Sequence, residues 1–157
     1  MEDSIPDCRR HATRSSEAAV SLDSLMILRA ALLGGTAVAL GAFGAHGLRP
    51  TLEAVGRTDS WETAVLYQFV HALALVAVGI WVRVDPQAAT SRPLQAAGWL
   101  WLAGVLCFSG SLYALALGAP SGWIWPVTPF GGLCFLGGWT LLALGARRRG
   151  PRAGPTA

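Results

Sequence analysis

The sequence predicts an all-α integral membrane protein, a bundle of four transmembrane helices with both termini in the cytoplasm. Composition is the first reason, because only 13% of the 157 residues are charged while 53% are hydrophobic. Soluble domains carry about 25% charged residues, so this chain lacks the polar surface that a water-exposed exterior needs. The second reason is that four apolar runs approach or exceed the ~20 residues that cross a bilayer. The third is the one-sided distribution of arginine.

The predicted spans cover residues 26–45, 64–82, 96–117 and 123–146. Lipid offers backbone groups no hydrogen-bond partner, so each span is expected to be a helix. Together they form one domain over residues 25–146. Residues 1–24 are polar and are predicted to be a disordered cytoplasmic leader. Residues 147–157 are predicted to be a basic cytoplasmic tail.

Arginine sets the expected orientation. The chain has no lysine, and of its 12 basic residues only Arg49 and Arg57 lie on the side opposite the termini. Arginine-rich ends stay in the cytoplasm, so both termini are expected there. Because the arginines lie at segment ends and not in a patch with aromatic residues, no nucleic acid partner is expected. Six tryptophans are expected to form two interfacial belts: Trp61, Trp123 and Trp125 outside, and Trp81, Trp99 and Trp101 inside.

Small residues mark the faces where membrane helices meet. The fourth span repeats glycine every seven residues, and the first and third spans also carry small-residue stripes. The predicted helix-packing positions are Gly34, Gly41, Gly110, Gly131, Gly138 and Gly145. These stripes either hold one bundle together or present a homo-oligomer face. The fourth span also contains Pro126 and Pro129, which predict a loosened or late-starting helix with Thr128 as its cap.

Polar side chains inside the spans are the candidate functional residues. Tyr67, Gln68 and His71 share one arc of a helical wheel and should face the bundle. With residues from other spans they predict a polar layer in the outer leaflet half. Its members are His46, Tyr67, Gln68, His71, Ser109, Ser111 and Thr128.

Two interpretations of this layer stay open. In the structural one, a neutral His71 is hydrogen-bonded by Gln68, Ser109 or a backbone carbonyl, which stabilises the bundle by about 0.6–2 kcal/mol. In the functional one, His71 carries protons or contacts a ligand at a site open to the outside. Glu62 begins the second span but points away from His71, so it is expected to be an interfacial charge near Arg57 or Arg49.

No metal site and no cofactor are predicted, because two histidines on different spans without a third ligand do not define a metal site. Cys8, Cys107 and Cys134 form no reactive pair, so a membrane thiol oxidase and enzymatic activity in general are not expected. The short turn "GAPSG" makes the third and fourth spans antiparallel neighbours. Cys107 and Cys134 should therefore lie at equal depth on facing helices.

Four sequence blocks occur in a familiar order: "GAFGAHGL" at 41–48, "WETAVLYQFVHALAL" at 61–75, "FSGSLYALALG" at 108–118 and "TPFGGLCFLGGW" at 128–139. They resemble the family called domain of unknown function 423, small four-helix membrane proteins related to transmembrane protein 256. The resemblance implies an integral protein of the bacterial inner membrane and implies no reaction. The characteristic positions of the family map onto Gly44, His46, Gly47, Trp61, Glu62, Tyr67, Gln68, His71, Ser109, Gly110, Ser111, Tyr113, Thr128, Pro129 and Gly131.

The sequence thus predicts a small multi-pass inner-membrane protein with a structural or accessory role. The alternative is a small oligomeric transporter or channel with a polar site in the outer leaflet half. Small four-helix exporters use an embedded carboxylate, and no span interior here contains Asp or Glu, which weakens that alternative. The expected partner is the lipid bilayer, with a homo-oligomer or a larger membrane complex left open.

Overall fold

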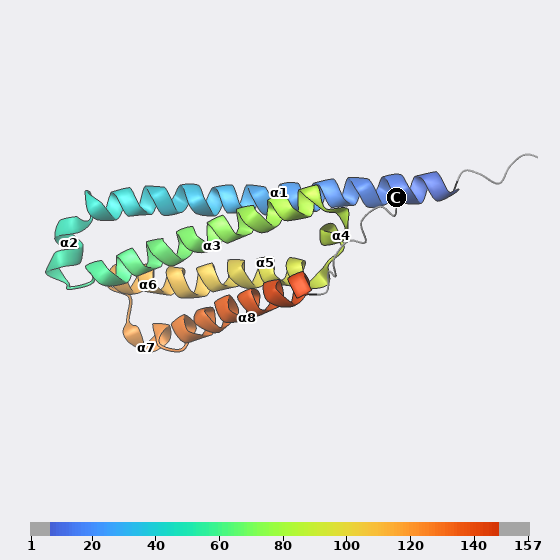
Figure 1. The fold of residues 1–157 in the computed structure, drawn as a ribbon. Coiled ribbons are helices and arrows are strands. Elements are labelled where there is room, and N and C mark those ends of the chain that lie inside the picture. The colour runs from blue at the N-terminus through green and yellow to red at the C-terminus, as the bar shows by residue number, and fades with distance from the viewer. Residues whose placement is uncertain (1–6, 148–157) are drawn as a thin grey trace, which may run out of the picture.

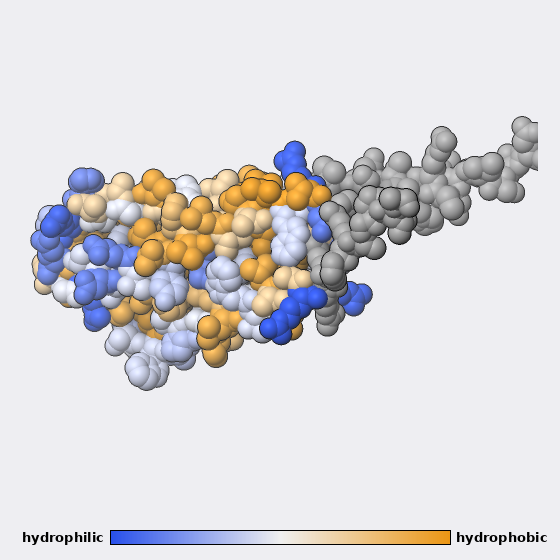
Figure 2. Space-filling view, viewed as in Figure 1, coloured by the Kyte–Doolittle hydropathy of each residue, from blue (hydrophilic) through white to orange (hydrophobic). Residues whose placement is uncertain are grey.

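The computed structural model describes residues 7–147, with side chains from Ser24 to Arg147 except Pro86 and Trp123. Helices make up almost all of this range, and four of them are long and apolar enough to cross a membrane. These spans are Ser24–Ala45, Thr58–Val84, Arg92–Ala116 and Val127–Arg147. Figure 2 shows hydrophobic residues over the middle of the molecule and hydrophilic residues at its two ends. The predicted all-α class with four spans is confirmed.

The first helix is longer than predicted. Helix α1 covers Asp7–Ala45, so it includes residues 7–24, which were expected to be disordered. The backbone of this part of the leader continues the first helix. The segment from Asp7 to Leu33 contains neither glycine nor proline, and extending an existing helix is far easier than starting one. Residues 1–6 of the predicted leader lie outside the described residues.

A short outer connection joins the first two spans. Helix α2 covers Arg49–Ala54, and Gly56 takes a positive φ of 63° to turn the chain into α3, Thr58–Val84. The second span therefore starts six residues before the predicted boundary at residue 64. Asp59 in the first turn of α3 favours this early start, because a carboxylate stabilises a helix N-terminus.

The third span is not one uniform helix. It follows α4, Pro86–Ala89, and consists of α5, Arg92–Gly104, a π-helical turn η1, Val105–Ser109, and α6, Gly110–Ala116. A π-turn inserts an extra residue into a helix and changes which side chains face inward beyond it. No sequence pattern had indicated it.

The fourth span starts late, as its prolines predicted. After the turn at Gly118, whose φ is 93°, helix α7 covers Ser121–Ile124 and α8 covers Val127–Arg147. Thr128 is not the cap that had been expected, because its hydroxyl donates backward to the Ile124 carbonyl at 3.4 Å. Of the predicted basic tail, only Arg147 is among the described residues.

The spans follow one another across the molecule in the order α1, α3, third span, α8 (Figure 1). Helix α1 packs mainly on α3, and the third span packs mainly on α8. Helix α3 also contacts the third span, and its His71 meets Trp139 of α8. The N-terminal end of α1 and the C-terminal end of α8 lie at the same end of the molecule. The two connections with few arginines therefore share the opposite end.

Glycines set the contact between the third span and α8. A Cβ at Gly131 would overlap the backbone of Phe108, one at Gly138 the indole of Trp101, and one at Gly145 the side chain of Leu94. These contacts advance by seven residues toward the C-terminus of α8 and by seven residues toward the N-terminus of the third span. The two antiparallel helices therefore keep one register along the whole hairpin. The third span and α8 thus pack antiparallel, and Gly131, Gly138 and Gly145 lie along their contact.

Helix α1 packs on α3 through its own small residues. A Cβ at Gly34 would reach Ala72 at 3.8 Å, and one at Gly41 would reach Val65 at 3.3 Å. The packing role expected for Gly110 is wrong, because this glycine is exposed and an added Cβ would meet only the Val105 carbonyl at 4.0 Å. Gly110 directly follows the π-turn, where the spacing of a regular helix no longer predicts which side chains face a neighbour.

Two tryptophans expected in the interfacial belts belong instead to the core. Trp61 is 3% exposed, lies over Gly44 and donates its indole N–H to the Leu40 carbonyl at 3.0 Å. Trp101 is fully buried over Gly138. Both rings fill space that a glycine on the facing helix leaves open. Trp99 keeps the expected exposed position, with the Arg29 guanidinium 4.0 Å above its ring.

Candidate functional site

Gln68 links three of the four spans. Its side chain is 4% exposed and donates from Nε2 to the Leu33 carbonyl at 2.9 Å and to Thr36 Oγ1 at 2.8 Å, both in α1. Its Oε1 accepts a hydrogen bond from the Tyr113 hydroxyl in α6 at 3.0 Å. Both donors and one acceptor site of the amide are therefore occupied by neighbouring helices.

His71, one helical turn further along α3, faces a different neighbour. Its Nδ1 lies 2.8 Å from the Tyr67 carbonyl, and the indole N–H of Trp139 in α8 points at its Nε2 at 3.2 Å. A carbonyl can only accept and an indole N–H can only donate. These two contacts select the neutral ring with the proton on Nδ1. The backbone carbonyl named in the structural interpretation is thus the partner, and Gln68 and Ser109 are not.

Aromatic rings surround the imidazole. The ring of Phe135 stacks on it with centroids 3.7 Å apart and planes 12° apart. Trp101 and Trp139 lie about it at centroid distances of 6.2 and 6.1 Å. Tyr67 packs its ring on Phe108, with centroids 4.6 Å apart, and is 39% exposed. Its contact with the His71 ring nitrogen is made by its backbone carbonyl and not by its hydroxyl.

A third polar contact ties α6 to α8. Ser111 Oγ lies 2.6 Å from Thr128 Oγ1, and Ser111 also donates to the Phe108 carbonyl at 2.9 Å. This pair closes the outer end of the hairpin that Gly131, Gly138 and Gly145 pack along. Hydroxyl pairs of this kind stabilise contacts between membrane helices.

Ser109 is buried without such a partner. Its Oγ is fully enclosed and has no hydrogen-bond partner among the described residues, and the same holds for Nε1 of Trp101. A helical serine ordinarily donates to the carbonyl four residues earlier, which here would be Val105. The π-turn from Val105 to Ser109 changes the helical hydrogen-bonding pattern between these two residues.

The polar residues do not form the single layer that had been predicted. They form three separate groups, centred on Gln68, on His71 and on the Ser111–Thr128 pair. His46 joins none of them, because it is exposed at the outer end of α1. No group of three His, Cys, Asp or Glu side chains that could hold a metal ion occurs within the part of the chain that the structure describes.

Two partners were not predicted from the sequence. Thr36 of α1 accepts from Gln68, and Trp139 of α8 donates to His71. The sequence could have indicated both partners. Thr36 lies in the middle of the first span and Trp139 lies far from either interface, and polar groups at such depths are costly in lipid unless they are paired. Tyr113 had been marked only through the family resemblance.

Comparisons with known proteins agree with this architecture. The model of the family described as "Protein of unknown function (DUF423)" matches residues 40–132. A UPF0382 membrane protein of Staphylococcus saprophyticus is 42% identical over 121 residues, covering 77% of this chain and 95% of the relative. One of Haemophilus influenzae is 45% identical over 117 residues, covering 74% and 88%. The UPF0382 inner membrane protein YgdD of Escherichia coli K12 is 41% identical over 124 residues, covering 78% and 89%. No solved structure matches the chain.

Proposed function

Because the chain belongs to the DUF423 family, we propose that it is a multi-pass protein of the bacterial inner membrane with a structural or accessory role. It acts by association with itself or with a larger membrane complex and has no enzymatic activity of its own. Both termini lie in the cytoplasm, on the arginine-rich side of the spans. The location agrees with that of the Escherichia coli relative YgdD, which is called an inner membrane protein.

One observation carries this proposal. The interior polar side chains pair with one another across helices: Gln68 with α1 and α6, and His71 with α8. A transport site needs polar atoms that are free to receive the substrate, and here both amide donors of Gln68 and both ring nitrogens of His71 are already used. Polar pairs of this sort fix the rotation and depth of each helix, which suits a protein that presents a defined outer surface.

Purification of the full chain in mild detergent tests the proposal. We expect a membrane protein partner, or a second copy, to remain bound at a fixed molar ratio when everything that co-purifies is identified by mass spectrometry. The matched control is an unrelated four-span protein with the same affinity tag, which should not retain that partner. A monomer that retains no protein at any detergent strength would contradict the accessory role.

The alternative of a small transporter or channel rests on Ser109. A buried hydroxyl without a partner, placed at a π-turn, is the kind of feature that accompanies functional sites. Replacement of Ser109 by alanine separates the two proposals. If the hydroxyl has no function, Ser109→Ala should raise the melting temperature in detergent or leave it unchanged, because an unpaired buried polar group is removed. A transport activity in proteoliposomes that Ser109→Ala abolishes would support the alternative.

A further inference from the structure

A groove of about 380 Å³ runs between α1 and α3, in the half of the spans next to α2. Gly41 and Ala45 of α1 leave the space, and Leu66 and Phe69 of α3 form the opposite wall. The lining is almost wholly apolar, and the volume falls within the range of small-ligand sites. The groove lies at the surface of the bundle that faces the surrounding lipid. Helix α1 packs mainly on α3, and its membrane segment is the least buried of the four spans.

The length of the groove matches one leaflet of the membrane. Its lining on α3 runs from Thr58 to Phe69, which corresponds to about 16 Å at 1.5 Å per helical residue. A bilayer is about 40 Å thick when its headgroups are included, so the groove spans most of one leaflet, from headgroup depth inward. It starts at the outer end of α3 and stops near the middle of the membrane.

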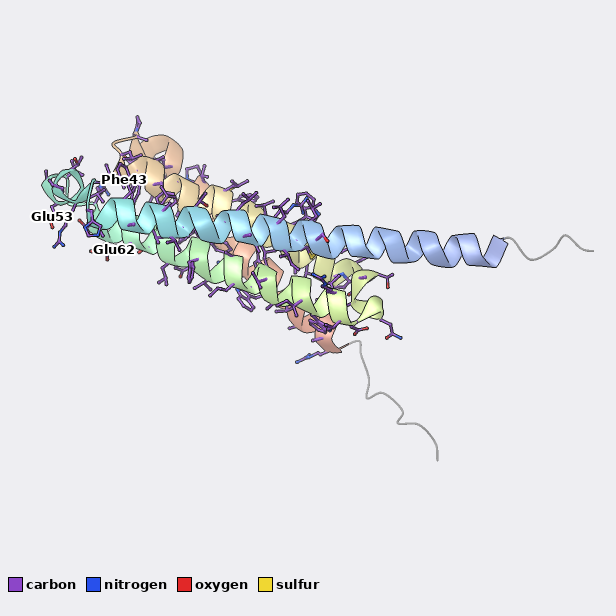
Figure 3. All side chains as sticks on the ribbon, turned by 90° about the horizontal axis from the view of Figure 1, so that it is seen from above. Phe43, Glu53 and Glu62 are labelled. Atoms are coloured by element: carbon purple, nitrogen blue, oxygen red, sulfur yellow. The ribbon has the colours of Figure 1, made fainter. Side chains whose placement is uncertain are left out.

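The outer end of the groove carries a carboxylate. Glu62 lines the groove next to Thr58 and is exposed, and Figure 3 shows it at the end of the molecule where α2 lies, together with Glu53. Arg49 is held by Glu53 at 2.8 Å. Within the described residues Glu62 forms no ion pair, although it attracts the Arg49 guanidinium at longer range. Its exposed carboxylate is therefore accessible to a cationic group at headgroup depth.

We propose that this groove binds one acyl chain of a phospholipid whose headgroup carries a primary ammonium, and that Glu62 accepts hydrogen bonds from this ammonium. The apolar wall contacts the acyl chain, and the Glu62 carboxylate distinguishes headgroups by the hydrogen bonds that they donate. A primary ammonium donates three hydrogen bonds, whereas a trimethylammonium of equal charge donates none. The lipid is preferred over a second copy of the protein because the groove has the depth of one leaflet and a single charge at its mouth.

Native mass spectrometry of the full chain in detergent tests the proposal. The probes are dioleoyl phosphatidylethanolamine and dioleoyl phosphatidylcholine, which share acyl chains and net charge and differ in the ammonium donors. We expect one lipid per chain, with phosphatidylethanolamine bound about threefold to fivefold more tightly, which is within the range of one net hydrogen bond. Equal retention of the two lipids by the native protein would overturn the role of Glu62.

Two pairs of variants separate the headgroup contact from the groove. Glu62→Gln should abolish the preference, and Asp59→Asn, an exposed acid on the same helix outside the groove, should keep it. Ala45→Phe should fill the groove and lower the binding of both lipids about fivefold or more, whereas Ala42→Phe, exposed but outside the lining, should not. If Ala45→Phe leaves lipid binding intact, or instead converts a dimer of the native protein into a monomer, the groove is not a lipid site.

Discussion

At the scale of single residues, His71 shows how a membrane interior accommodates an ionisable side chain. The ring is held between the Tyr67 carbonyl, the Trp139 indole and the face of Phe135. A second proton on Nε2 would point at the indole N–H of Trp139 and break that contact. His71 is therefore a neutral side chain that links α3 to α8 by a hydrogen bond. This geometry supports the structural interpretation of His71 over the functional one.

This role predicts a measurable coupling between His71 and Trp139. His71→Phe keeps a ring on Phe135 but removes the acceptor, and Trp139→Phe removes the donor. Thermal unfolding in detergent, followed by circular dichroism, should show that the double variant loses less stability than the sum of the single variants. The coupling should be about 0.5–2 kcal/mol. Additive losses would mean that the hydrogen bond contributes nothing, and intact stability with a lost phenotype would favour a functional His71.

At the scale of elements, the hairpin of the third span and α8 depends on three glycines spaced by seven residues. At Gly131 the nearest neighbour is the backbone of Phe108, which cannot move aside as a flexible side chain would. At Gly132, the next residue, an added Cβ meets nothing within 4 Å. Two adjacent glycines in one helix thus have opposite surroundings.

This contrast predicts opposite effects of the same substitution. Gly131→Ala should destabilise the protein by about 1–3 kcal/mol, the usual cost of overpacking a well-packed contact. Gly132→Ala should be neutral or slightly stabilising, because alanine favours the helix without a new contact. Melting temperatures in the same detergent measure both. Equal effects of the two changes would show that the hairpin does not pack through Gly131.

The same hairpin places Cys107 and Cys134 on packed elements, η1 and α8, as free thiols. A short, membrane-permeant bis-maleimide should therefore link them within one chain in a Cys8→Ser background. Proteolysis and mass spectrometry identify the product, and single Cys→Ser variants serve as controls. Links only between chains would assign this face to an oligomer. No link, despite reaction of both thiols with a mono-maleimide, would contradict the pairing.

At the scale of the whole molecule, four spans place both described ends on one side. The arginine distribution predicts that this side faces the cytoplasm. A reporter fused after Arg152 should be active only in the cytoplasm, and one inserted next to Thr58 only outside. Reporters at Gln87, in the connection between the second and third spans, should behave like those after Arg152. An external C-terminus would reverse the orientation and with it the leaflet of the lipid groove.

The sequence by itself determined the membrane class, the four spans and the antiparallel packing of the last two. These features depend on properties that a chain carries locally: the length of an apolar run, the spacing of Gly131, Gly138 and Gly145, and a turn too short for any other connection. The late start of α8 is of the same kind, since Pro126 ends the preceding helix wherever α8 packs.

Only the tertiary structure decided which polar groups meet. A helical wheel shows that Gln68 and His71 face inward, but their partners depend on how far each neighbouring helix is rotated and shifted. Thr36, Tyr113 and Trp139 are 32, 45 and 68 residues away from the groups that they bind. The burial of Trp61 and Trp101 follows from glycines on other helices, and Gly110, which follows the π-turn, has no neighbouring helix against it. A pattern within one helix cannot specify these relations, because they belong to the contact between two helices.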